Sequence, residues 1–106
     1  MTDIPATMQA VTIEGGKGPA SALRVSEIPT PEPREGQILV RVLAAGVNRP
    51  DLAQRMGFYP PPPGSPETMG LEIAGEVVKG AGRWKEGDMI CALLGGGGYA
   101  QYAAVD

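Results

Sequence analysis

The sequence predicts a small, mainly β fold: an irregular β-barrel of about six strands and one short helix. Three observations support this. The chain has 106 residues, which is room for one domain but not for two. Its 16 Gly and 11 Pro make turns frequent. Apolar residues alternate with polar ones in several short segments, without the regular exchange of strands and helices that a parallel sheet requires.

Six segments are expected to be strands from their alternating or continuous apolar residues: 8–13, 23–28, 37–45, 71–78, 89–94 and 99–105. Segment 37–45 is the longest and contains one charged residue, Arg41, so both of its faces should be covered and it should be central in a sheet. Segment 29–36 has prolines at alternate positions and is expected to be an extended surface connector.

A short helix is predicted to start after Asn48, with Pro50 in its first turn, and to run to about Met56, before Gly57. Asn48 is suited to cap its N-terminus, and Asp51 would lie near the positive end of the helix dipole. The same Asn48 amide would instead be functional if it faced a cleft. Tyr59 is open to the same two interpretations, because its phenol beside four prolines can either pack or direct its hydroxyl at a ligand.

Composition excludes several classes of function. With 9 Lys and Arg against 12 Asp and Glu, and no basic run, the chain lacks the electrostatic footprint of a nucleic-acid binder. It has no apolar stretch of about 18–20 residues, so we expect no membrane span. We also expect no secretory signal, because the first residues lack a basic region and an apolar core. One cysteine, Cys91, permits no internal disulfide and favours a reducing, cytoplasmic setting. Without histidine, the chain can form neither a His-based zinc site nor a Ser-His-Asp triad.

Other conspicuous residues have structural interpretations. The glycines at 95–98 predict a tight turn rather than a phosphate loop, because a strand-like segment follows them instead of a helix. The prolines at 60–63 favour a rigid loop that shapes a pocket wall over a ligand for a proline-reading domain. Cys91 is expected to be a buried small hydrophobe, and Trp84 to close an edge of the barrel. Glu72 and Glu76 should face solvent, since they alternate with apolar residues.

Four motifs follow one another in the order of a known family: residues 36–42, 45–51, 70–77 and 84–88. Over about residues 8–105 they resemble the N-terminal GroES-like, alcohol dehydrogenase-like domain of medium-chain dehydrogenases/reductases. Asn48, the 59–64 loop and segment 93–99 resemble the zinc-free quinone oxidoreductase branch. The resemblance implies a partly open barrel in which residues 1–106 form the N-terminal portion of the catalytic domain, with residues 1–7 flexible.

The resemblance also implies a site without zinc. In zinc alcohol dehydrogenases of this superfamily, the positions that match Asn48 and Leu71 hold a cysteine and a histidine ligand. Neither an amide nor a leucine side chain replaces them as a zinc ligand. The cysteine cluster that binds a structural zinc in those enzymes is missing too.

By this resemblance the function is NADPH-dependent hydride transfer to a quinone or activated alkene. Asn48 and Tyr59 would be the catalytic residues and would hydrogen-bond a carbonyl oxygen of the substrate. Asn48, Arg49 and Asp51 would form the cofactor-binding set, with Arg49 near the phosphates and Asp51 supporting the turn. Pro50 stands where alcohol dehydrogenases keep a proton-relaying hydroxyl, which argues against alcohol oxidation. The alternatives are an enoyl reductase of the same superfamily and a non-catalytic GroES-like binding or assembly module.

The nucleotide-binding Rossmann domain of the family, with its glycine fingerprint, is not found in the 106 residues. We therefore expect either a fragment or a reduced stand-alone module, with an incomplete barrel, weak NADPH binding and negligible turnover. Because an incomplete barrel leaves strand edges unpaired, we also expect a homo-oligomer.

Overall fold

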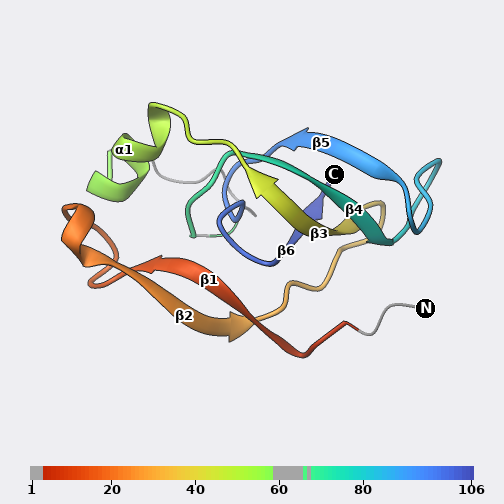
Figure 1. Ribbon diagram of the computed structural model, residues 1–106, viewed down its shortest axis with the longest axis horizontal. Coiled ribbons are helices and arrows are strands. Elements are labelled where there is room, and N and C mark those ends of the chain that lie inside the picture. The colour runs from red at the N-terminus through yellow and green to blue at the C-terminus, as the bar shows by residue number, and fades with distance from the viewer. Residues whose placement is uncertain (1–3, 59–65, 67) are drawn as a thin grey trace.

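The computed structural model describes residues 4–58, 66 and 68–106. In chain order, the elements of this part are β1 (Thr7–Ile13), the 3₁₀ turn η1 (Ala20–Ala22), β2 (Leu23–Pro29), β3 (Ile38–Ala45), α1 (Pro50–Met56), β4 (Glu72–Lys79), β5 (Met89–Leu93) and β6 (Tyr102–Val105) (Figure 1). The predicted mainly β fold with one short helix is confirmed. All the expected strands form, and the differences lie at their ends.

The strands form two antiparallel sheets. β1 and β2 make a hairpin, and the second sheet has the order β5-β4-β3-β6. Residues 99–101 join the two sheets, because the Val11 N–H donates to Tyr99 O at 2.8 Å and the Val42 N–H donates to Gln101 O at 2.8 Å. Figure 1 shows the hairpin beneath the larger sheet, with α1 beyond the end of β3. The result is a partly open barrel.

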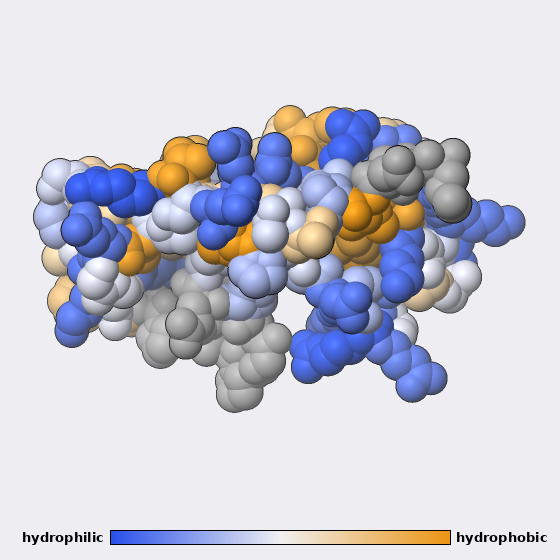
Figure 2. Space-filling model, turned by 90° about the horizontal axis from the view of Figure 1, so that it is seen from below, coloured by the Kyte–Doolittle hydropathy of each residue, from blue (hydrophilic) through white to orange (hydrophobic). Residues whose placement is uncertain are grey.

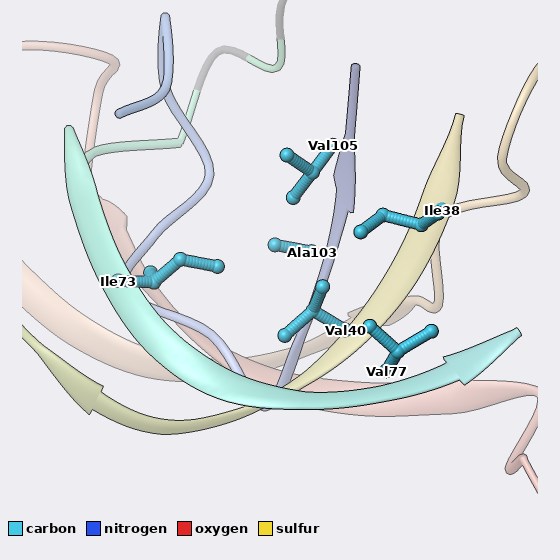
Figure 3. Close-up of a cluster of buried hydrophobic side chains, with 6 residues drawn as sticks. All are labelled: Ile38, Val40, Ile73, Val77, Ala103 and Val105. Carbon is cyan, nitrogen blue, oxygen red and sulfur yellow. The ribbon is translucent and has the colours of Figure 1, made fainter. Parts of the chain in front are cut away.

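β3 is central, as its sequence predicts, because β4 and β6 flank it. One of its faces contributes to a buried cluster whose side chains point toward one another from β3, β4 and β6 (Figure 3): Ile38, Val40, Ile73, Val77, Ala103 and Val105. On its other face, Leu39 packs with Met8, Val78 and Tyr102 against the hairpin. This double coverage is limited to the first half of the strand, since Leu43 is 52% exposed.

Two expectations need correction. Cys91 is exposed rather than buried, because β5 is an edge strand whose alternation turns Met89, Cys91 and Leu93 outward. The last strand begins at Tyr102 rather than at Tyr99, since residues 99–101 cross between the two sheets instead of pairing along one of them.

Three of the four consecutive glycines, Gly96–Gly98, are buried, and their backbone is closely packed. The Gly98 N–H donates to Gly70 O at 3.0 Å. A Cβ on Gly70, whose φ is +106°, would approach Gly98 Cα to 2.7 Å. Absent side chains therefore let two chain segments touch, and this contact brings Tyr99 to the end of β3.

The surface is mixed in character. Figure 2 shows one face of the molecule, on which hydrophobic residues form separate patches among hydrophilic ones. In the part of the chain that the structure describes, none of the helices has the length and apolar character to cross a membrane.

Candidate functional site

The segment that connects β3 to α1 carries the candidate site. β3 ends at Ala45, and α1 begins at Pro50 with Arg49 as its N-cap residue. The prediction that Asn48 caps the helix is therefore wrong. The helix begins one residue later than that role requires, and no side chain caps it. The Asn48 amide instead turns to β4, where its Nδ2 donates to Glu72 Oε1 at 3.1 Å.

Asp51 holds this segment from the first turn of α1. Its Oδ2 accepts the Asn48 backbone N–H at 2.9 Å, and the Asp51 N–H donates to Asn48 O at 3.0 Å. The Asp51 side chain thus reaches back from the first turn of α1 to the N–H of the residue that precedes the N-cap. Asp51 is 4% exposed, and its Oδ1 is buried without a hydrogen-bond partner among the described residues.

Tyr99 reaches the same carboxylate from the other side. Its hydroxyl donates to Asp51 Oδ2 and also lies 3.2 Å from Gly46 O. Burial raises the pKa of Tyr99 to about 12, and the hydrogen bond to Asp51 and the charge of Asp51 act in the same direction. The phenol therefore stays protonated at neutral pH and serves as a donor. The buried Asp51 carboxylate and the half-buried Tyr99 phenol thus contact the connecting segment at Asn48 and at Gly46.

Glu72 binds the segment from β4. Its backbone oxygen accepts the Gly46 N–H at 2.9 Å, while its side chain accepts Asn48 Nδ2. A Cβ on Gly46 would collide with the Glu72 carboxylate, so the glycine makes room for that side chain. Glu72 is exposed, as its sequence position predicts, but its carboxylate has a specific partner rather than only solvent.

The sequence-predicted site residues are placed as follows. Asn48 is half-buried and lies in the hydrogen-bonded network with Asp51. Arg49 is exposed, and its guanidinium makes no hydrogen bond or ion pair with any other described residue. Tyr59 lies outside the described residues. Contact of any of these side chains with a substrate or a cofactor stays a prediction.

Sequence reasoning missed three residues of this network. Glu72 lies 24 positions from its partner Asn48, and Tyr99 lies 48 positions from Asp51. Gln54, 8% exposed on α1, accepts the Gly70 N–H at 3.2 Å and so holds the approach to β4. The sequence signal for these residues is a polar side chain in an unusual position. Glu72 is an acid at the start of a strand, Tyr99 is a tyrosine directly after four glycines, and Gln54 is an amide within a short helix.

The chemistry that this arrangement offers is hydrogen-bond donation. Asn48 Nδ2 carries two hydrogens, and the network uses one of them. The second can donate to an acceptor such as a carbonyl oxygen. Beside it, the Arg49 guanidinium can attract an anion. The described residues contain no group of three or more His, Cys, Asp or Glu side chains that could hold a metal ion.

Comparison with known proteins shows to which family the chain belongs. The model of the alcohol dehydrogenase GroES-like domain matches residues 34–106. The chain is 35% identical over 103 residues to the chloroplastic quinone-oxidoreductase QR1 of Triphysaria versicolor, covering 90% of this chain and 31% of that protein.

Solved structures of the same superfamily have the same fold as this chain. The quinone oxidoreductase of Coxiella burnetii superposes with a TM-score of 0.78 at 26% identity, over 94% of this chain and 35% of that one. The mycobacterial protein Rv1454c, solved in complex with NADPH, superposes with a TM-score of 0.76 at 30% identity, over 92% of this chain and 29% of its own. The chain thus spans about one third of the length of the relatives that it matches. From the family match, the sequence identities and the shared fold, we conclude that the chain belongs to the alcohol dehydrogenase GroES-like domain family, in the quinone oxidoreductase branch of the medium-chain dehydrogenases/reductases.

Proposed function

We propose that the chain is the catalytic-domain portion of a zinc-independent, NADPH-dependent quinone oxidoreductase, in which Asn48 and Tyr59 hydrogen-bond a carbonyl oxygen of a quinone or activated alkene. One observation carries the proposal: the Asn48 amide is held in place by Glu72 and keeps an N–H without a partner among the described residues. The similarity to quinone oxidoreductases supports the substrate class.

The residues of the chain would act by charge stabilisation. When hydride reaches a quinone, negative charge develops on a carbonyl oxygen. A donor that is already fixed in position stabilises this charge without reorganising, and removal of one such donor typically costs about 3–4 kcal/mol in the barrier. Asn48 suits this role because its backbone N–H and its side chain are both hydrogen-bonded, to Asp51 and Glu72. Tyr59 is proposed as the second donor.

Arg49 and its neighbours are suited to bind a phosphate and the nicotinamide end of a dinucleotide. Arg49 presents a guanidinium without an ion-pair partner among the described residues, which suits a phosphate group. Asn48 would contact the nicotinamide side, and Asp51 would act by holding the turn that carries both neighbours. When bound, the nicotinamide supplies the hydride. With only these contacts, we expect the 106-residue chain to bind NADPH weakly and to turn over negligibly.

Zinc independence rests on donor chemistry. Zinc in proteins is bound by thiolate, imidazole or carboxylate groups. The chain has no histidine, and its one cysteine, Cys91, lies on the edge strand β5. The resemblance aligns Asn48 and Leu71 with two ligand positions, and neither side chain is a zinc ligand. A reducing, cytoplasmic location and homo-oligomer formation complete the proposal.

The test is binding of duroquinone to the ¹⁵N-labelled chain, followed at the Asn48 side-chain amide in two-dimensional NMR spectra. We expect saturable shifts at the Asn48 side-chain amide and at the backbone amides of Gly46 and Asp51, and Asn48→Leu should abolish those backbone shifts. The matched control is Gln9→Leu, which removes an exposed amide on β1 and should leave the binding unchanged.

Two outcomes would contradict the proposal. If an α,β-unsaturated thioester shifts Asn48 and duroquinone does not, the chain is a part of an enoyl reductase. If neither compound shifts Asn48 at millimolar concentration, the binding-module alternative replaces the enzyme. Steady NADPH oxidation by the purified chain would show that the expectation of negligible turnover is wrong.

A further inference from the structure

Glu72 is the first residue of β4 and binds the Asn48 segment twice. Its backbone oxygen accepts the Gly46 N–H at 2.9 Å, and its Oε1 accepts Asn48 Nδ2 at 3.1 Å. Gly46 leaves space for the carboxylate, because a Cβ there would collide with Glu72 Oε1. The loop and the strand therefore meet at Glu72 through both its backbone and its side chain.

An asparagine amide has two different ends, an oxygen that only accepts and a nitrogen that only donates, and the two orientations have almost the same shape. An ionised carboxylate only accepts hydrogen bonds. It therefore admits the nitrogen of Asn48 and disfavours the oxygen. We propose that Glu72 is a positioning residue that selects the amide orientation of Asn48, with the nitrogen toward β4 and its second N–H available to a substrate oxygen. The orientation is independent of the proposed function, whereas its use by a substrate rests on it.

The neighbouring acid on the same face of β4 has a different partner. Glu76 lies four residues along the strand and pairs with Arg41, whose Nη2 is 2.8 Å from Glu76 Oε1. Glu72 has no such ion pair within the described part of the chain, and Asn48 is its side-chain partner. The two glutamates thus share a strand face but differ in what they hold, and this makes Glu76 a matched control.

The experiment uses the full 106-residue chain labelled with ¹⁵N and ¹³C. The first measurement needs no variant: a scalar coupling across the hydrogen bond between Asn48 Nδ2 and the Glu72 carboxyl carbon. The second compares the Asn48 side-chain amide signals in the wild type, Glu72→Gln and Glu76→Gln. A glutamine both donates and accepts, so Glu72→Gln keeps the size of the side chain but loses the selection of orientation.

We expect the coupling in the wild type, a large change of the Asn48 amide signals in Glu72→Gln, and unchanged signals in Glu76→Gln. If both orientations become equally populated, the competent fraction falls by half. Because the apparent dissociation constant rises as the inverse of that fraction, duroquinone should bind about twofold more weakly, and up to about tenfold more weakly if the flipped orientation dominates.

The outcomes separate the two proposals. Absence of the coupling, or identical Asn48 signals in the wild type and Glu72→Gln, would overturn the role of Glu72. Presence of the coupling together with a silent duroquinone titration would leave the orientation standing and overturn the quinone function. Equal duroquinone affinity of the wild type and Glu72→Gln, with binding intact, would show that the selected orientation has no part in substrate binding.

Discussion

Replacing Tyr99 by phenylalanine removes one hydroxyl and leaves the ring in place. In the structure this hydroxyl donates to Asp51 Oδ2, and Asp51 already has a buried Oδ1 without a described partner. Among the described residues, the variant leaves the buried carboxylate with one hydrogen bond, from the Asn48 N–H. A hydrogen bond to a charged group contributes about 1.5–3 kcal/mol, so we expect a loss of about 2 kcal/mol in the free energy of unfolding.

Thermal unfolding followed by circular dichroism would measure this loss. For a domain of this size, about 2 kcal/mol corresponds to a fall in Tm of about 8–16 °C. Tyr102→Phe is the matched control. Tyr102 is 8% exposed, and its hydroxyl has no hydrogen-bond partner in the described residues, so we expect a change of at most about 0.5 kcal/mol.

A spectrophotometric titration at alkaline pH gives a second readout. The Tyr99 pKa is raised from 10.0 to about 12, chiefly by burial and then by Asp51. The folded state therefore keeps a proton that the unfolded state has lost. The stabilisation from this group is complete below pH 10 and falls as pH rises toward 12. We expect a step of phenolate absorbance near pH 12 in the wild type, and we expect the step at that pH to be missing in Tyr99→Phe.

Two results would refute this reasoning. If Tyr99→Phe and Tyr102→Phe unfold at the same temperature, the contact with Asp51 contributes nothing to stability. If the alkaline step is the same in the wild type and in Tyr99→Phe, the titrating group is another tyrosine, and the assigned pKa is wrong.

Three further predictions concern packing and the surface. Gly70→Ala should lower the free energy of unfolding by more than about 2 kcal/mol in urea, because the positive φ of Gly70 and its contact with Gly98 admit no Cβ. The control is Gly82→Ala, where no atom lies within 4 Å of the added Cβ. Equal losses in the two variants would refute the prediction. Leu93 is 83% exposed on the edge strand β5, so the wild type should self-associate in light scattering, and Leu93→Lys should reduce this self-association. A wild type that stays monomeric at high concentration would refute the prediction. The Arg41–Glu76 pair has side chains 43% and 34% exposed and should contribute less than about 1 kcal/mol in a double-mutant cycle, and a larger coupling would show that solvent screens it poorly.

The sequence by itself determined the elements. Alternation with a period of two is a local property, and it predicted β3 and its central place, because that strand is apolar on both faces over Ile38–Val40. The helix from Pro50 to Met56 was also predictable, since proline at its start and Gly57 at its end act on their own neighbours. The family resemblance, carried by motifs in order, is confirmed by the matching domain model.

Only the tertiary structure decided how the site is assembled. Asn48 can either cap a helix or bind a distant acid, and a sequence cannot rank the two because the competing partner, Glu72, lies 24 residues away. The Asp51–Tyr99 bond joins residues 48 positions apart and exists because buried glycines let two backbones touch. Cys91 was misplaced for the same reason: whether an apolar strand is central or at an edge depends on which strand lies beside it. Pairing between distant segments is a property of the folded chain, and the hydrogen bonds that hold Asn48 follow from it.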